Sequence, residues 1–344
     1  IVFFLTYALI AFTRTVLLVY AARWLFGVAV GINDVSNSIY LSENFTPKFR
    51  GQFGSIATTN FFGAILIESC MVNFLSYDAV AYTNAVVAFL ALINVILSTE
   101  TPHFLIMKGK YERAFENYLW LRGKDEATVV ELAEFEKLKG RIEEERKEKR
   151  TIWTFLHNPV YRKTISLVLV FCLLSVATGS SAVTAFASIT FTKDVFTPNE
   201  FTIIFSAFLF GASFFGSLII EKVNRRTILI ISFLIAMTVH AGTASLLYLK
   251  DQIDIPYFSW WILSTITAYS MLYSFCIMSV FYTIRGELLP QNIRPFGSAV
   301  AIMGHGLMGF LTVEVFLFVD KIFGMYWNFF FYALMSLVSL FFVY

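Results

Sequence analysis

The sequence predicts an all-α membrane protein with about nine full transmembrane helices and part of one more. Hydrophobic residues make up 58% of the 344 residues, charged residues make up only 15%, and the mean hydropathy is +0.70. A soluble domain of this length could not bury so much apolar surface. Most of the apolar residues also fall in uninterrupted runs, and this pattern is typical of helices that cross a bilayer.

The apolar runs follow one another along the chain and define the expected spans. A helix needs about 20 apolar residues to cross the hydrocarbon core. The run from Ile1 to Phe12 is too short to cross a bilayer by itself. Because the chain begins and ends inside apolar runs, we expect it to be a fragment of a longer protein. The nine full spans are expected at roughly 16–40, 52–74, 79–98, 164–191, 201–221, 227–248, 258–284, 296–318 and 325–344.

The positions of lysine and arginine orient these spans. About half of the charged residues lie in one block, from Lys108 to Arg150. That block and the basic residues near 48–50, 222–226 and 285–294 occupy alternate connections, which the positive-inside rule places in the cytosol. The net charge of +2 gives no signal for nucleic-acid binding.

A short charged sequence occurs twice, once in each half of the chain. One copy runs from Glu43 to Arg50 and the other from Glu287 to Arg294. In both copies six residues separate the glutamate from the arginine, a proline lies between them, and Phe-Gly-Ser follows. Each copy also lies between two apolar runs. Internal duplication of this kind is typical of secondary transporters.

Further motifs make the whole chain similar to the sugar porter family of the major facilitator superfamily. The segment Ala22–Val28, which contains Arg23, resembles the family's Gly-Arg-x-x-x-Gly helix. Thr99–Leu105 and Lys108–Lys110 resemble its Pro-Glu-Ser-Pro-x-x-Leu and Lys-Gly-Lys sequences. Glu221–Arg226 resembles its acid-x-x-Gly-Arg-Arg loop, with an asparagine in place of the glycine. The two Glu-x6-Arg sequences resemble the family's paired loops.

The resemblance implies a major facilitator fold, of which this chain contains helices three to twelve of twelve. It divides the chain into the remainder of an amino-terminal half at 1–100, cytosolic linker helices at 101–160 and a six-helix carboxy-terminal half at 161–344. It also implies alternating access, in which the cytosolic ends of the halves close and part. The alternative interpretation of the charged motifs is that their residues only set the topology of the chain in the membrane. The gating residues that we expect are Glu43, Arg50, Glu221, Arg225, Arg226, Glu287 and Arg294.

Three further charged residues lie within the expected spans. Counting along the helices places Arg23 and Glu68 at a similar depth near the outer surface, where we expect them to pair. Asp34 lies at a depth where an unpaired carboxylate is costly. It is either a proton-coupling group or a packing acid, so uniport and proton symport both remain open.

The expected substrate site differs from that of the family. The helix-seven motif Gln-Gln-x-x-Gly-x-Asn is replaced by Ser175–Ser181, the helix-eight asparagine by Leu209 and the helix-ten tryptophan by Tyr282. The Gly-Pro-Gly-Pro hinge is replaced by Cys276–Ser279. Hydroxyls, phenols and one imidazole remain to bind a solute. The pocket residues that we expect are Thr58, Ser175, Thr178, Ser181, Tyr273, Tyr282 and His305.

These observations predict a multi-pass protein of the plasma membrane that transports a sugar or sugar-like solute, such as a hexose, trehalose or a polyol. A non-transporting membrane sensor on the same scaffold and a carrier of another small organic solute are the alternatives. We find no nucleotide-binding loop, metal-ligand spacing or nucleophile–base arrangement, so the sequence does not predict an enzyme or a cofactor.

Overall fold

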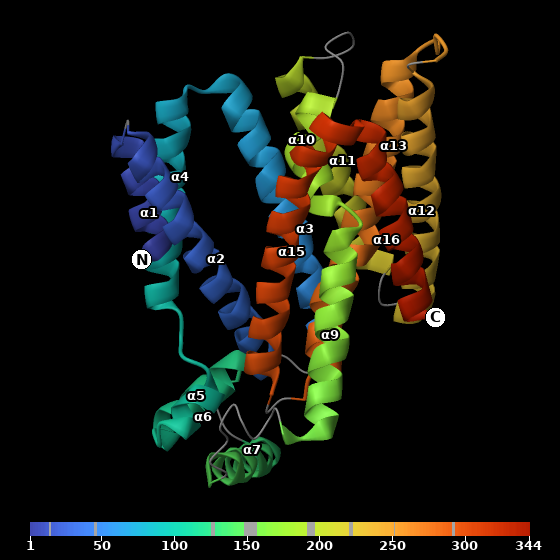
Figure 1. Cartoon of the computed structure of the whole chain (residues 1–344). Coiled ribbons are helices and arrows are strands. Elements are labelled where there is room, and N and C mark those ends of the chain that lie inside the picture. The colour runs from blue at the N-terminus through green and yellow to red at the C-terminus, as the bar shows by residue number, and fades with distance from the viewer. Residues whose placement is uncertain are drawn as a thin grey trace. The chain divides into compact units, whose positions relative to one another are not determined.

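The fold is helical throughout the part of the chain that the structure describes. The computed structural model describes residues 1–13, 15–44, 47–124, 128–147, 157–190, 197–219, 223–250, 252–290 and 293–344. Every regular element in these ranges is a helix (Figure 1). The predicted all-α class is therefore confirmed.

Nine of the described helical segments are long and apolar enough to cross a membrane, and each falls on one of the predicted spans. The shorter apolar helix Val2–Phe12 also matches its prediction. The chain is a multi-pass membrane protein. The nine segments are Val16–Asn37, Ile56–Phe74, Tyr77–Leu97, Pro159–Ala187, Pro198–Ile219, Arg225–Leu249, Phe258–Arg285, Arg294–Phe323 and Met325–Val343.

The contacts divide the chain into two compact units. Unit 1 comprises Ile1–Arg50, Tyr77–Lys163 and Pro290–Ser298. Within it, α1 packs against both α2 and α4, around a small core that contains Ile10, Ala22 and Ala81 (Figure 1). Its main helices are α1 (Val2–Phe12), α2 (Val16–Asn44), α4 (Tyr77–Leu97), α5 (Pro102–Met107), α6 (Tyr111–Leu121) and α7 (Val129–Lys147).

Unit 2 comprises Gly51–Ser76, Thr164–Leu289 and Ala299–Tyr344. Within it, α12 runs beside α16 and also packs against α13 (Figure 1). Its elements are most of α3 (Pro47–Phe74), most of α9 (Pro159–Ala177), α10 (Ser180–Thr190), α11 (Pro198–Ile219), α12 (Arg225–Leu249), α13 (Phe258–Leu272), the π-helical turn η1 (Tyr273–Ile277), α14 (Met278–Leu288), most of α15 (Arg294–Phe323) and α16 (Met325–Val343).

A glycine breaks the membrane span that contains α9 and α10. Gly179 has a φ of +92°, a conformation that residues with a side chain rarely adopt. A Cβ atom at this position would also lie only 2.5 Å from a ring carbon of Tyr332 on α16. Close packing of α16 and the reversal of φ therefore both require glycine at this break.

The second irregularity is the π-helical turn η1, which joins α13 to α14. The backbone N–H of Met278 donates to the carbonyl of Tyr273, five residues earlier. The turn lies beside α11, where a Cβ atom on Gly216 would come within 2.4 Å of the Phe275 carbonyl oxygen. The turn overlaps the segment in which the related family has its Gly-Pro-Gly-Pro hinge.

We expect Gly179→Ala to destabilise unit 2. A positive φ costs a residue with a side chain about 1–3 kcal/mol, and the contact with Tyr332 adds to that cost. The thermal unfolding midpoint of the purified protein should fall, with less monodisperse protein recovered. The matched control is Gly211→Ala in α11, where nothing lies within 4 Å of the added Cβ. Equal effects of the two substitutions would contradict this account of the break.

Candidate functional site

A cavity of about 300 Å³ lies within unit 2, among helices that span the membrane. This volume is at the lower end of the range for small-molecule sites in proteins. We call it the polar cavity, because hydroxyl, phenol and imidazole groups contribute to its wall. The residues that line it are Phe61, Phe62, Ile65, Ser180, Ser181, Thr184, Ala185, Leu209, Tyr269, Ser270, Tyr273, Met278 and His305.

The wall is neutral and rich in hydroxyl groups. Four aliphatic hydroxyls, two phenols and one imidazole line it, and no carboxylate, ammonium, guanidinium or amide side chain does so among the described residues. These groups both donate and accept hydrogen bonds to uncharged partners. The phenyl rings of Phe61 and Phe62 add an apolar surface. Such a wall suits an uncharged, polar solute that carries an apolar face.

Two phenols of the wall have polar partners. The Tyr269 phenol oxygen lies 2.7 Å from the hydroxyl of Thr178, and the Thr178 hydroxyl donates to the Ser175 carbonyl at 2.7 Å. The Tyr273 hydroxyl lies 3.7 Å from the sulfur of Met278, which also lines the cavity. These contacts orient both phenol rings.

Other lining hydroxyls are used in different ways. Thr184 donates to the Ser180 carbonyl at 2.8 Å, within its own helix. The Ser181 hydroxyl faces Gly309, where an added Cβ would lie 3.1 Å from it. The Ser270 oxygen has no hydrogen-bond partner among the described residues, although its side chain is buried. An unsatisfied hydroxyl at a cavity wall can bind water or a polar solute group.

The structure brings together three of the seven predicted pocket residues, Ser181, Tyr273 and His305, in the cavity wall. Thr178 and Ser175 lie behind the wall and support Tyr269. Thr58 is fully buried in α3 and is not among the lining residues. A role of the seven predicted residues in solute binding stays a prediction.

Tyr282 occupies a different environment from the one expected for a pocket residue. It is not among the lining residues, and its ring lies 4.7 Å from the buried guanidinium of Arg285. A cation–π contact of this kind holds the ring next to the arginine. Leu209, which replaces the family's helix-eight asparagine, does line the cavity. The lining residues Tyr269 and Ser270 were not identified from the sequence, because they lie in an apolar run without a motif.

One pair of gating candidates meets inside a unit, among the described residues. In unit 2, Arg225 lies 3.3 Å from the carboxylate of Glu287, and Arg226 donates to the backbone carbonyl of Tyr344. Arg294, in unit 1, is buried, and Arg23 is exposed on α2. Glu221 and the side chain of Arg50 lie outside the described residues.

In unit 1, Glu43 contacts the start of the linker helices. Its carboxylate accepts a hydrogen bond from the Thr101 hydroxyl at 2.6 Å and lies 3.4 Å from Nδ1 of His103. Thr101 is also the N-cap of α5, because its oxygen accepts from the backbone N–H of Phe104. One hydroxyl therefore joins the carboxy-terminal end of α2 to α5.

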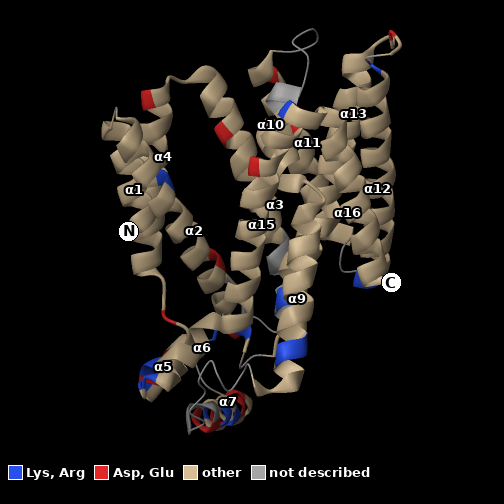
Figure 2. Ribbon diagram, in the orientation of Figure 1, with Lys and Arg blue, Asp and Glu red and all other residues tan. Residues whose placement is uncertain are grey.

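The linker helices form a compact, charged module of their own. Leu105, Ile106, Tyr118, Phe135 and Ile142 pack in its core. Within unit 1, most charged side chains lie on or beside α6 and α7, as Figure 2 shows. The cytosolic location of 101–160 stays a prediction.

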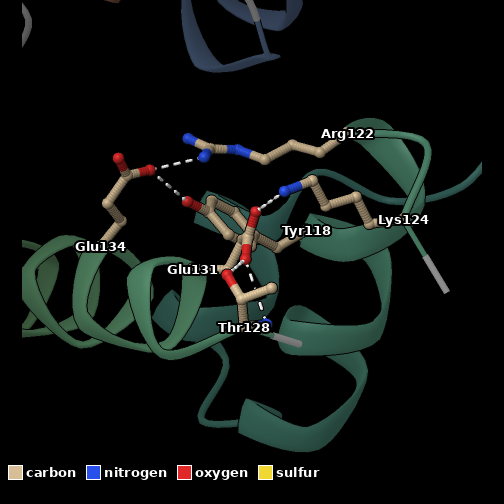
Figure 3. A network of polar contacts seen from close by, with 6 residues as sticks. All are labelled: Tyr118, Arg122, Lys124, Thr128, Glu131 and Glu134. Carbon is tan, nitrogen blue, oxygen red and sulfur yellow. Dashed lines mark hydrogen bonds and ion pairs between the residues drawn. The ribbon is translucent and has the colours of Figure 1, made fainter. Parts of the chain in front are cut away.

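A network of polar contacts joins α6 to α7 (Figure 3). Arg122 and the Tyr118 hydroxyl both donate to the carboxylate of Glu134, at 2.5 and 3.1 Å. Lys124 and Thr128 donate to Glu131. These bonds hold the pKa of Glu131 at about 2 and lower that of Glu134. Burial, followed by the bond to Glu134, raises the pKa of Tyr118 to about 12.

The chain matches a known family over its whole length. The family described as "Sugar (and other) transporter" matches residues 1–344. Among curated relatives, the facilitated trehalose transporter Tret1 of Polypedilum vanderplanki is 28% identical over 99% of this chain and 68% of its own length. Tret1 of Apis mellifera ligustica is 27% identical over 85% of this chain and 58% of its own length. The chain thus spans only about three fifths to two thirds of these relatives.

Solved structures show the same fold. A proton:xylose symporter, XylE, superposes with a TM-score of 0.79 at 17% identity, over 99% of this chain and 77% of its own. The fucose:proton symporter FucP of E. coli superposes with a TM-score of 0.56 at 14% identity, over 99% and 80%. Because the first of these belongs to the major facilitator superfamily by its description, the predicted major facilitator fold is confirmed.

We expect the linker module to lose stability as the pH falls from about 4.5 to about 2. Glu131 has a lower pKa when folded, about 2, than its ordinary value of 4.5. Its stabilising contribution is therefore complete above pH 4.5 and is lost as protonation proceeds toward pH 2. The measurement is the rate at which an acid-active protease cleaves between α6 and α7.

Glu131→Gln should be cleaved faster at the upper end of this pH range and should depend less on pH. Glu136→Gln is the matched control, because Glu136 lies on the same helix with its side chain 63% exposed and meets Lys139 only at 3.4 Å. A pH dependence that is unchanged in Glu131→Gln would show that another group controls the stability.

Proposed function

This chain belongs to the sugar (and other) transporter family, and from this premise we propose that it carries a sugar or sugar-like solute across the membrane by alternating access. The polar cavity is the observation that carries the proposal. It is about 300 Å³ in volume, lies among membrane-spanning helices and has a neutral wall rich in hydroxyls. No lipid-facing surface needs such a wall, because polar groups in hydrocarbon are costly unless they bind something.

The chemistry of the wall favours an uncharged solute with several hydroxyl groups. A charged solute would require a counter-charge, and no charged side chain lines the cavity among the described residues. A hexose, a polyol and trehalose all meet this requirement. The curated relatives named as trehalose transporters support trehalose as one substrate to test.

The wall has no amide among its described lining residues, whereas the sugar porter family normally uses amides to bind hexoses. Leu209 stands at one such position and lines the cavity. We therefore propose a solute that is less polar or bulkier than glucose. A membrane sensor that binds this solute without moving it is the second candidate, favoured by the same loss of amides and by the lost Gly-Pro-Gly-Pro hinge.

We further propose that 1–100 and 161–344 act as the two moving halves and that 101–160 links them on the cytosolic side. The salt bridges at the cytosolic helix ends would form and break during the cycle. Pairs of this kind suit that role because exposed ion pairs contribute only about 0.2–1 kcal/mol each. A modest energy keeps both states accessible.

Proton coupling is the finer part of the proposal. Asp34 is a half-buried carboxylate in α2, within a segment that spans the membrane. Membrane-embedded carboxylates often serve as proton sites. One of the solved neighbours is a proton:xylose symporter, which supports testing this coupling. Uptake that increases with an inward proton gradient, and loses that increase in Asp34→Asn, would support symport.

The first experiment is uptake of labelled trehalose and glucose into transport-null cells. We expect saturable uptake by the wild-type protein. Arg225→Ala should reduce the rate by up to about fivefold, which corresponds to an ion pair of at most about 1 kcal/mol. The reverse pair Arg225→Glu with Glu287→Arg should restore part of the rate, because the two side chains meet at 3.3 Å.

Lys250→Ala is the matched control at the opposite end of α12, where the side chain lies over the Phe258 ring. It should leave uptake unchanged. Solute binding without uptake or counterflow, at normal surface abundance, would support the sensor. Absence of both binding and uptake for every sugar and polyol tested would refute the proposed substrate class.

A further inference from the structure

We propose that a groove between α15 and α16 binds a membrane sterol, whose hydroxyl donates a hydrogen bond to Asn328. We call it the α15–α16 groove. It belongs to unit 2 and shares no lining residue with the polar cavity. The inference goes beyond the proposed function, because it concerns a lipid of the bilayer and not the transported solute.

The α15–α16 groove is large enough for a small molecule. Its volume is about 470 Å³, which lies within the range of small-molecule sites in proteins. On α15 the lining residues recur at helical spacing along Met308–Phe323, so they share one face of the helix. On α16 they are Trp327, Asn328, Phe331 and Tyr332, near the start of the helix.

The groove lies within two membrane spans. These are Arg294–Phe323 and Met325–Val343, which meet at Gly324 (Figure 1). Among the lining residues, Val315 and Phe331 are exposed. Exposed apolar side chains in a span contact hydrocarbon. A ligand that reaches this groove therefore comes from the bilayer.

A buried amide provides a polar point in the groove. Asn328 lines the groove and is only 3% exposed. Its Nδ2 donates to the carbonyl of Phe316 on α15 at 3.0 Å, and this bond orients the amide. Its Oδ1 makes no hydrogen bond to any described residue. An amide oxygen without a partner is costly in hydrocarbon, so this atom is suited to accept a hydrogen bond from a ligand.

Two hydroxyls accompany the amide. Thr312 lines the groove and donates to the Gly309 carbonyl at 2.9 Å, so its oxygen can only accept from a ligand. Tyr332, one turn after Asn328, is 2% exposed, and its hydroxyl has no hydrogen-bond partner in the described part of the chain. A phenol both donates and accepts. A ligand hydroxyl, which does the same, complements these groups.

The combination of one polar point with a large apolar wall indicates a sterol. No charged side chain lines the groove among the described residues, so a phospholipid headgroup would find no counter-charge. An acyl chain could not donate to Asn328. A water molecule or a sugar would satisfy the amide but would leave the apolar wall unmatched. A sterol carries one hydroxyl on a rigid apolar body that can pack on Trp327 and Phe331.

The position of the amide along its helix agrees with this ligand. Asn328 lies four residues after Gly324, about 6 Å along the helix axis from the end of the span. The lining of α15 continues from Phe323 back to Met308, over about 22 Å. The amide thus lies near the membrane boundary, and the apolar wall extends toward the bilayer centre. A sterol has the same orientation in a bilayer, because its hydroxyl stays near the polar boundary.

The test is photolabelling of the purified protein in lipid nanodiscs with a diazirine analogue of cholesterol. The label should appear on peptides of α15 and α16, and excess cholesterol should remove it. An analogue of cholesterol without the hydroxyl should compete about threefold to tenfold less well, as expected for one lost hydrogen bond.

Two substitutions test the polar contact. Asn328→Leu removes the amide and should abolish the difference between the two competitors. Tyr332→Phe removes only a hydroxyl and should reduce that difference. Both competitors are compared in the same preparation of each variant. A general loss of stability would affect them equally and would not imitate this result.

A third substitution tests the apolar wall. Val315→Trp places a large ring in the groove and should reduce labelling by about tenfold. Leu317→Trp on the same helix is the matched control, because Leu317 is 50% exposed, close to the 48% of Val315, but does not line the groove. It should leave labelling unchanged.

Three results would overturn the proposal. The first is equal competition by the two sterols for the wild-type protein. The second is equal labelling of Val315→Trp and Leu317→Trp, or no label on α15 and α16, which would show that the groove is covered by something else. The third is stronger labelling by a diazirine fatty acid than by the sterol, which would identify a surface for acyl chains. Because no step measures uptake, each result leaves the proposed transport of a sugar undecided.

Discussion

The structure depends on one constraint, that backbone groups within the hydrocarbon must find partners inside the protein. Regular helices meet this constraint by themselves, and the span that contains α9 and α10 does not, because Gly179 interrupts it. Two of its carbonyls are satisfied by the Thr178 hydroxyl and by the Gly179 amide. At η1, the Met278 amide and the Ser279 hydroxyl reach back five residues for the same reason. Both irregularities adjoin the polar cavity, to which Tyr273 and Met278 contribute directly.

This constraint also determines what the cavity can recognise. A hydroxyl that satisfies the backbone or a neighbouring phenol has less capacity left for a solute. The Tyr269 hydroxyl is engaged with Thr178, and the Tyr273 hydroxyl contacts the sulfur of Met278. Ser270 has the hydroxyl with no partner among the described residues. We therefore propose that the cavity selects its solute by the shape of its aromatic walls more than by a dense set of hydrogen bonds.

The sequence predicts the spans well, because each one depends on the sum of many apolar residues in one run. Individual pocket residues depend on which face of a helix they occupy, and the irregular turns change that. Tyr282 lies nine positions after Tyr273, so at about 100° per residue even an uninterrupted helix would place them on opposite faces. Only Tyr273 lines the cavity.

The charges at the cytosolic helix ends show how a gate can be built from weak contacts. Glu43 is bonded to Thr101 and His103 within unit 1, and Glu287 to Arg225 within unit 2. Each glutamate therefore already has a partner in its own unit. A gate between the halves must exchange such partners. Exchange is possible only if each pair contributes little to the stability of one conformation. The Glu287 side chain is 52% exposed and that of Arg225 is 24% exposed, so solvent screens their attraction. The exposed pair of Glu287 and Arg225 therefore has the weakness that the proposed gating role of Glu287 requires.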